Sequence, residues 1–168
     1  MAATKSINAT VVAVVNTLIA SLNAEVDAVA AQWTDGIPLL HPVKILPFWR
    51  PPQQLVMGAS GPVVIVSSLG GRTLSDGALG WQEMAHMVEV TALVRTNDLY
   101  QAEAQAARYL EAIQEALVKH QQLDNSLRAC VGVQLGRYGK SMVLSSPAKE
   151  FLGYNAGWEV TIRLEELM

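Results

Sequence analysis

Two short segments of the chain hold residue types that could carry out phosphate-binding or nucleophilic chemistry. Residues 139–141 have the Gly-Lys-Ser ending of a P-loop, but that motif also needs a glycine where this chain has Gln134, and a helix must follow it. Residues 146–149 fit the Ser-x-x-Lys nucleophile pattern, but Pro147 disfavours the helix that this pattern requires and its partner motifs are missing. We therefore expect neither segment to form a reactive centre.

The side chains that could bind metals or transfer protons are scattered along the chain. His41, His86 and His120 never stand three or four residues apart, so no helix can present two of them together. Cys130 is the only cysteine, and its apolar segment favours a small core residue. The adjacent carboxylates at 165–166 would point apart on a strand. The sequence predicts no enzyme, with no catalytic residues, no cofactor and no metal. A small cytoplasmic enzyme or ligand-binding protein is the alternative, and it would need a pocket of convergent polar groups.

The composition favours a protein that hides much of its surface. The 168 residues suit one domain, 51% of them are hydrophobic, and only 16% are charged, where about 25% is usual. Contacts between copies of the chain would account for this, as would a large core. The net charge of −3 and the lack of a basic run argue against sequence-specific nucleic-acid binding. A mildly acidic subunit can still line a passage through which DNA slides.

The N-terminal segment predicts one long amphipathic helix over residues 6–34. Ser6 is a suitable N-cap, and Gly36 and Pro38 are expected to end the helix. The helix would be about 40 Å long, which is long for a domain of this size. Its apolar stripe is expected to cover the sheet, and the alternative is that part of the stripe faces another subunit. The stripe consists of Ile7, Val11, Val14, Leu18, Leu22, Val26, Val29 and Trp33.

The same segment has some features of a secretory signal, because Lys5 precedes an apolar stretch. However, a single lysine makes a weak positive region, and Asn16, Thr17 and Asn23 interrupt the apolar residues. No run of about 18 or more apolar residues is present. We expect neither secretion nor contact with a membrane. A secreted or envelope-attached protein is a further alternative.

Residues 36–61 are rich in proline, which breaks regular elements. They also contain many apolar side chains, which favours a strap packed on a surface over a free linker. We call residues 36–61 the Pro-rich strap. The sequence shows no repeat and no second domain. It predicts a single domain over residues 1–168, made of the helix at 6–34, the Pro-rich strap at 36–61 and an α+β body at 62–168.

The first part of the body is predicted to be a hairpin. Residues 62–68 and 83–95 are expected to be strands. Residues 69–81 lie between them and are rich in Gly, Ser and Asp, which is typical of a long, mobile loop. One face of the second strand is expected to carry Met84, His86, Val88, Val90, Ala92 and Val94.

A second helix and three more strands are predicted to complete an α+β fold, a mostly antiparallel sheet with two helices packed on one face. The helix is expected to begin at Asn97 and Asp98, where Asp98 and Gln101 can form a capping box. Its apolar stripe is predicted to be Leu99, Ala102, Ala106, Leu110, Ile113 and Leu117. The expected strands are residues 129–135, 141–145 and 158–164, with a turn at 137–140 and with Trp158, Val160, Ile162 and Leu164 facing inward.

Three stretches of the body resemble the tail-terminator (tail-completion) proteins of long-tailed phages. They are residues 86–90 (HMVEV), 106–113 (AARYLEAI) and 157–162 (GWEVTI), and with the order of the elements the likeness covers about residues 60–168. The resemblance implies a hexameric ring that caps the finished tail tube and joins it to the head connector. It implies a structural virion protein of the tail or neck, assembled in the host cytoplasm and without catalytic residues. Another neck protein, a stopper or an adaptor, is the alternative.

A ring of this kind implies contacts with copies of the same chain, with the tail tube protein and with the head-tail connector protein. The loop at 69–81 is expected to become ordered on docking, because its glycines lose entropy when they are fixed. Trp49 and Trp81 flank loops, where an exposed aromatic ring suits a partner contact. The predicted interface residues are Trp49, Arg50, Gly70, Gly71, Arg72, Asp76 and Trp81.

Overall fold

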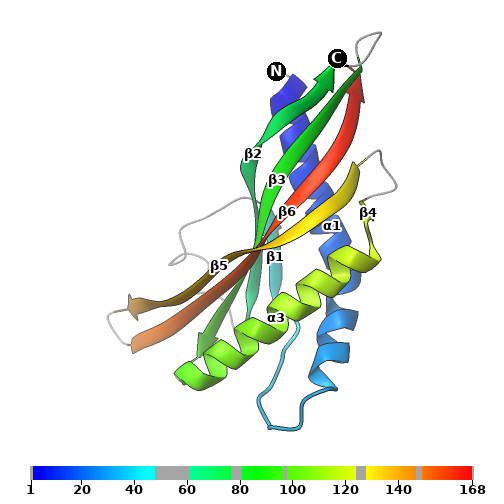
Figure 1. The fold of residues 1–168 in the computed structure, drawn as a ribbon. Helices are drawn as coiled ribbons and strands as arrows, with labels where there is room; N and C mark the ends of the chain where they lie inside the picture. The colour runs from blue at the N-terminus through cyan, green and yellow to red at the C-terminus, as the bar shows by residue number, and fades with distance from the viewer. Residues whose placement is uncertain are drawn as a thin grey trace.

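The fold was determined as a computed structural model that describes residues 2–47, 61–76, 81–96, 98–123, 128–146 and 149–167. Within these residues, two long helices and six strands follow one another (Figure 1). In chain order they are α1 (Ala2–Ala30), β1 (Lys44–Pro47), β2 (Val63–Asp76), β3 (Trp81–Thr96), α3 (Leu99–Lys119), β4 (Gln122–Leu123), β5 (Arg128–Ser146) and β6 (Lys149–Leu167).

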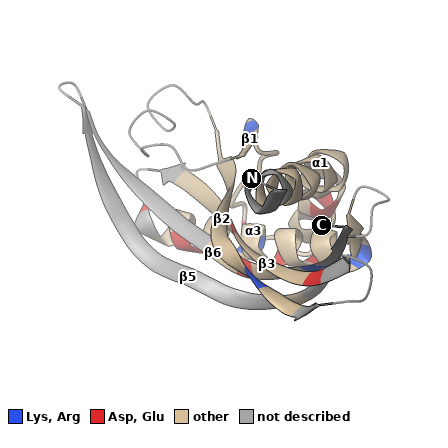
Figure 2. Ribbon diagram, turned by 90° about the horizontal axis from the view of Figure 1, so that it is seen from above, with Lys and Arg blue, Asp and Glu red and all other residues tan. Residues whose placement is uncertain are grey.

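All six strands form one sheet in the order β1-β2-β3-β6-β5-β4. The β1–β2 pair is parallel and every other neighbouring pair is antiparallel. Seen from above, α1 and α3 lie on the same side of β2, β3 and β6 (Figure 2). The prediction of an α+β fold with a mostly antiparallel sheet and two helices on one face is confirmed.

The long N-terminal helix is confirmed, but its predicted bounds of 6–34 are wrong at both ends. Ser6 lies inside α1, because the preceding residues continue the helix back to Ala2. At the other end two short-range hydrogen bonds tighten the chain, from Gln32 N to Val29 O (3.0 Å) and from Trp33 N to Ala30 O (3.2 Å). Trp33 therefore lies beyond the helix, where its ring meets a side chain of α3.

The prediction of a mobile loop over residues 69–81 is wrong. The first strand of the hairpin continues to Asp76 and the second begins at Trp81, so only residues 77–80 lie between them. Pairing with residues 82–87 of β3 holds the glycine-rich segment in the sheet, and irregularities between Ser68 and Gly70 and between Thr73 and Ser75 absorb its poor strand propensity. Gly70 has a φ of +111°, which a glycine adopts readily.

The predicted turn at 137–140 is also wrong. Residues 128–146 form the single strand β5, which pairs with β6. The register of this pair shifts between Leu135 and Tyr138 and again between Gly139 and Met142. The turn-forming residues thus produce bulges within a continuous strand instead of reversing the chain.

Two short strands were not expected. Lys44–Pro47 of the Pro-rich strap forms β1 beside β2, although proline was predicted to exclude regular structure there. Pro47 is tolerated because it ends an edge strand, where its missing N–H breaks no ladder. The other short strand, β4, pairs with β5 at Arg128 and Ala129.

The start of α3 agrees with the prediction. The Asp98 carboxylate accepts hydrogen bonds from the backbone N–H groups of Tyr100 (2.9 Å) and Gln101 (3.4 Å), which satisfies two donors of the first turn. Trp158 of β6 packs against the core and donates from Nε1 to the Leu110 carbonyl of α3 at 2.7 Å. The buried stripe of α3 includes Ala102, Ala106, Leu110, Ile113 and Leu117, as expected.

The core lies between the sheet and the two helices. The face of β3 that was predicted to be buried contributes Val88, Val90 and Ala92 to this core. Cys130 of β5 is also buried in it. Burial raises the pKa of the Cys130 thiol, as expected for a core cysteine.

Within α1, the segment Ile7–Ala30 is long and apolar enough to span a membrane by length and composition, and half of its most apolar window is buried inside the protein. A buried core helix passes the same test.

Candidate functional site

The structure separates the predicted interface residues into three groups. Trp49 and Arg50 lie outside the described residues. Asp76 ends β2 and Trp81 begins β3, at the hairpin end of the sheet. The remaining three, Gly70, Gly71 and Arg72, are consecutive in β2 and pair with Met87, His86 and Ala85 of β3, respectively.

Gly71 was predicted to be an interface residue in a loop, but the structure gives it a role in packing. A Cβ atom at this position would lie 2.7 Å from Cδ2 of the His86 ring and 3.3 Å from the Ala85 carbonyl oxygen. The His86 ring is fully buried, and its Nδ1 lies 2.9 Å from Thr10 Oγ1 of α1. Gly71 therefore allows β2 to pass close to a histidine that links β3 to α1. His86 lies with Val88 and Val90 on the same face of β3, as predicted from the alternation of the strand, and it is buried.

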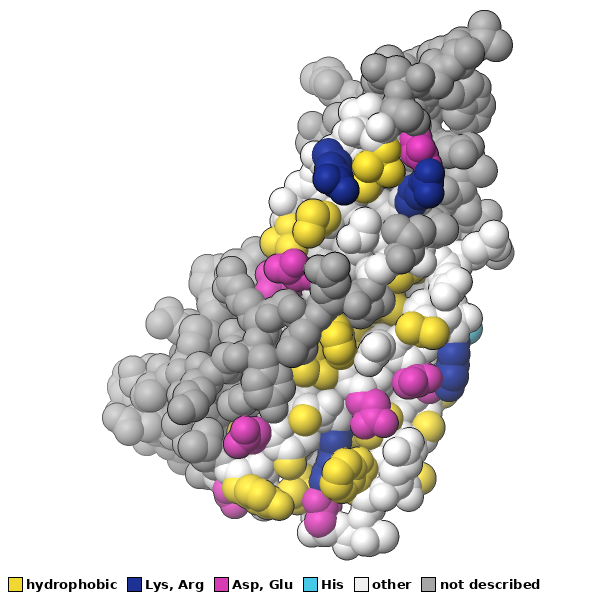
Figure 3. All heavy atoms as spheres, in the orientation of Figure 1, with side chains coloured by type: hydrophobic (Ala, Val, Ile, Leu, Met, Phe, Trp, Pro, Cys, Tyr) yellow, Lys and Arg dark blue, Asp and Glu magenta, His cyan; other side chains and the backbone are white. Residues whose placement is uncertain are grey.

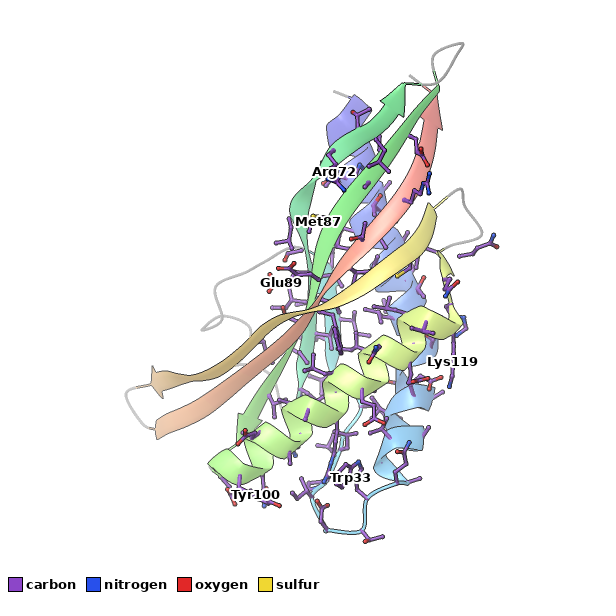
Figure 4. All side chains as sticks on the ribbon, viewed as in Figure 1. Trp33, Arg72, Met87, Glu89, Tyr100 and Lys119 are labelled. Carbon is purple, nitrogen blue, oxygen red and sulfur yellow. The ribbon has the colours of Figure 1, made fainter. Side chains whose placement is uncertain are left out.

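Arg72 lies on the opposite face of the sheet, which points away from the helices. The register places it in one row with Ala85 of β3 and Arg163 of β6. Met87 occupies the next row of β3 and is 39% exposed. We call Arg72, Ala85, Met87 and Arg163 the Arg–Met patch. In Figure 4 the side chains of Arg72 and Met87 project from the same side of the sheet, and Figure 3 shows basic and hydrophobic side chains next to each other on this end of the molecule.

The two arginines of this patch differ in their ion pairing. The Arg163 guanidinium forms an ion pair with Glu83 of β3. Among the described residues no ion pair to Arg72 is present, so this cation can interact with a partner. Arginine and methionine are enriched in protein interfaces, and a half-exposed methionine one row away from two arginines has that composition. The patch is thus suited to bind a protein surface.

Among the described side chains of β3, exposure on this face is confined to the hairpin end. Further along β3, on the same face, Glu89 and Thr91 are buried. Gly157 of β6 lies beside Thr91, and a Cβ there would approach Thr91 Oγ1 to 2.8 Å. The outward face therefore changes from open at Met87 to closely packed at Thr91, which gives the Arg–Met patch a defined boundary.

A second polar cluster, which the sequence did not reveal, holds the chain that follows α1. Arg108 of α3 is only 3% exposed, and its guanidinium forms an ion pair with Asp35 and donates to the Ile37 carbonyl at 3.3 Å. The same group stacks over the Trp33 ring, 4.4 Å from its centroid. We call Trp33, Asp35 and Arg108 the Arg108 clasp. An arginine on the border of the apolar stripe of α3 was the available signal, but its partners lie more than 70 positions away in the sequence.

Two neighbours of Arg108 on α3 extend this attachment. Gln105 Nε2 donates to the Pro38 carbonyl at 2.7 Å, and the Tyr109 hydroxyl donates to the Leu40 carbonyl at 2.5 Å. Burial raises the pKa of the Tyr109 hydroxyl. The first part of the Pro-rich strap is therefore fixed to α3 by side chains that bind its backbone.

The Arg108 clasp predicts a defined pH dependence. The hydrogen bond from Arg108 holds the pKa of the Asp35 carboxyl below its ordinary value. A lowered pKa in the folded state contributes stability above the unfolded pKa of about 3.9, and this contribution is lost as the pH falls through the folded value. Asp35→Asn should therefore destabilise the protein at neutral pH, and the difference from wild type should shrink progressively as the pH falls below about 4. Urea unfolding between pH 3 and pH 7 measures this. In an Arg108→Ala background the substitution should have no pH-dependent effect.

The histidines and the cysteine do not converge on one site. His41 pairs with Asp27 of α1 (2.7 Å), His86 is buried under β2, and His120 follows the last turn of α3. Among the residues that the structure describes, no group of three or more His, Cys, Asp or Glu side chains is placed to hold a metal ion.

Comparison with known proteins assigns the chain to no family. No protein-family model matches the sequence. A search of curated proteins finds no significant match.

Proposed function

We propose that this protein is a structural subunit of a phage neck, a ring-forming tail terminator that caps the tail tube and joins it to the head connector. The observation that carries the proposal is the Arg–Met patch, an exposed surface of interface composition on the face of the sheet that points away from both helices. The likeness of residues 60–168 to tail terminators supplies the biological setting. The partners we propose are copies of this chain, the tail tube protein and the connector protein.

The edges of the sheet supply the second requirement of a ring. A head-to-tail contact needs two different surfaces on one subunit, and it closes into a ring when the rotation between neighbours allows it. At one edge, β1 covers only Val63 to Val66 of β2 and leaves residues 67–76 without a neighbour among the described strands. At the other edge, β4 covers β5 only at Arg128 and Ala129. Strand edges of this length are natural contact sites for another chain.

The length of β5 and β6 also supports contacts between subunits. A strand of 19 residues such as β5 or β6 extends over about 63 Å. The 21 residues of α3 extend over about 32 Å. Because α3 covers about half the length of β5 and β6, we propose that the part of these two strands beyond α3 contacts neighbouring subunits in the ring.

Mass photometry and negative-stain electron microscopy of the purified chain test the proposal. We expect closed rings, with a mass of about 109 kDa for six copies of the 18.1 kDa chain. A chain that stays monomeric at every concentration and salt condition would contradict the proposed ring. Open filaments would support the head-to-tail contact but contradict the cap, because a terminator must close.

The Arg–Met patch gives a specific variant for the same assay. Met87→Lys places a third cation in the row next to Arg72 and Arg163, and burying it in an interface core is unfavourable. We expect at least about a tenfold rise in the concentration needed for assembly, with the melting temperature of the subunit changed by only a few degrees. Tyr100→Lys is the matched control, because Tyr100 is 70% exposed on α3, away from the patch. Equal assembly of Met87→Lys and wild type would exclude the patch from the ring contact.

A further inference from the structure

The exposed face of α1 carries no charged residue between Ile7 and Ala24. A surface helix normally places charged residues opposite its buried stripe. In α1 the two acidic residues, Glu25 and Asp27, are already paired with Lys119 and His41. Between Ile7 and Ala24 the exposed residues are only Asn8, Ala9, Val12, Asn16, Ile19, Ala20, Asn23 and Ala24.

Four of these residues form one straight seam. Val12, Asn16, Ile19 and Asn23 follow one another in steps of four, three and four, and each is exposed. Steps of this kind align side chains along a single line of a helix, as at the contact positions of a coiled coil. We call these four residues the α1 seam. Ile19 is 59% exposed, which is a high value for an isoleucine on an otherwise unoccupied helix face.

The alternation of apolar residues and asparagines in the α1 seam indicates what kind of surface binds there. The apolar residues Val12 and Ile19 are seven positions apart, and so are the amides of Asn16 and Asn23. An amide side chain carries both a donor and an acceptor and is therefore complementary to another copy of itself. A lipid surface would leave these amides without hydrogen-bond partners. Asparagine at such a position is known to fix the register of two identical parallel helices.

We infer that a second copy of this chain packs its own α1 against this face, parallel and in register. Asn16 then meets Asn16, Asn23 meets Asn23, and the small alanines beside the seam let the two backbones approach. The contact is two-fold and uses the helix side of the subunit, so it does not depend on the proposed head-to-tail ring. A single pair of helices buries less than the about 1,600 Å² of a standard interface, so we expect a weak dimer.

Cysteine cross-linking tests the register directly. Asn16→Cys should give a covalent dimer under mild oxidation, because the two thiols would face each other across the axis. Ala28→Cys is the matched control, since Ala28 is exposed on α1 but lies off the seam. The wild type reports any background from Cys130. Absence of the dimer from Asn16→Cys, or equal dimer from both variants, would overturn the inference.

A charge variant tests the contact without cross-linking. Ile19→Glu should weaken dimerisation at least about tenfold in sedimentation equilibrium, because two glutamates would meet at the seam. Val118→Glu is the control, as Val118 is 48% exposed on α3 and outside the seam. Circular dichroism verifies that both variants fold. Unchanged dimerisation of Ile19→Glu would refute the seam, as would binding of the wild type to phosphatidylglycerol vesicles that Ile19→Glu abolishes.

The outcomes also separate this inference from the proposed function. Rings that persist in Ile19→Glu, together with no cross-link from Asn16→Cys, would contradict the α1 contact and would still support the terminator proposal. Conversely, a cross-link from Asn16→Cys in a protein that never forms rings would support the two-fold contact and contradict the terminator.

Discussion

Arg108→Ala is expected to lower the free energy of unfolding by about 3 kcal/mol, because it removes a buried cation together with its ion pair, a hydrogen bond and a stacked ring. The guanidinium is almost fully buried between Asp35, the Ile37 carbonyl and Trp33. Its loss leaves these groups without the side chain that joins them to α3. Urea unfolding at pH 7 measures the difference.

Arg72→Ala is the matched control for this experiment. It removes the same side chain from an exposed position of β2, where no ion pair is present among the described residues, and should change the stability by less than about 0.5 kcal/mol. Arg108→Lys should recover little, because an ammonium group can neither stack flat on Trp33 nor reach two acceptors in one plane. Equal effects of Arg108→Ala and Arg72→Ala would show that the Arg108 clasp contributes nothing to stability.

Gly71→Ala is expected to destabilise the protein by about 2 to 3 kcal/mol, although alanine is the smallest possible addition. The backbone of Gly71 does not need a positive φ, so the cost comes from contact alone. The new methyl group would overlap the His86 ring, which is enclosed by α1 and cannot move aside freely.

A double-mutant cycle separates this contact from general effects on the strand. His86→Ala alone should also destabilise, because it leaves a cavity beside Thr10. In the double variant the alanine at 71 has room, so the two losses should sum to more than the measured loss by at least about 1 kcal/mol. Additive losses in thermal or urea unfolding would mean that Gly71 and His86 do not constrain each other.

The parts of the fold that follow from short-range pattern were predictable. The buried face of β3 and the stripe of α3 were predicted because a period of two or of 3.6 residues records burial directly. The Asp98 cap was predictable because its partners are two and three residues away.

The remaining parts depend on contacts that the sequence does not display. Residues 69–76 have the composition of a loop, but β3 and the register shifts that it permits turn them into strand. The same explanation holds for residues 137–140 in β5. The Arg108 clasp was missed because nothing in the sequence around Arg108 shows which backbone carbonyls lie next to α3 in the fold. Gly71 was assigned to a surface because its neighbour His86 lies on another strand.

The way in which α3 holds the strap has an evolutionary consequence. Gln105, Arg108 and Tyr109 bind the backbone carbonyls of residues 37, 38 and 40, which every amino acid possesses. The side chains at 37–40 are therefore not specified by these bonds, whereas the three donors on α3 are. Homologues can drift in this stretch and acquire new surface chemistry there, provided that they retain the donors that grip the main chain.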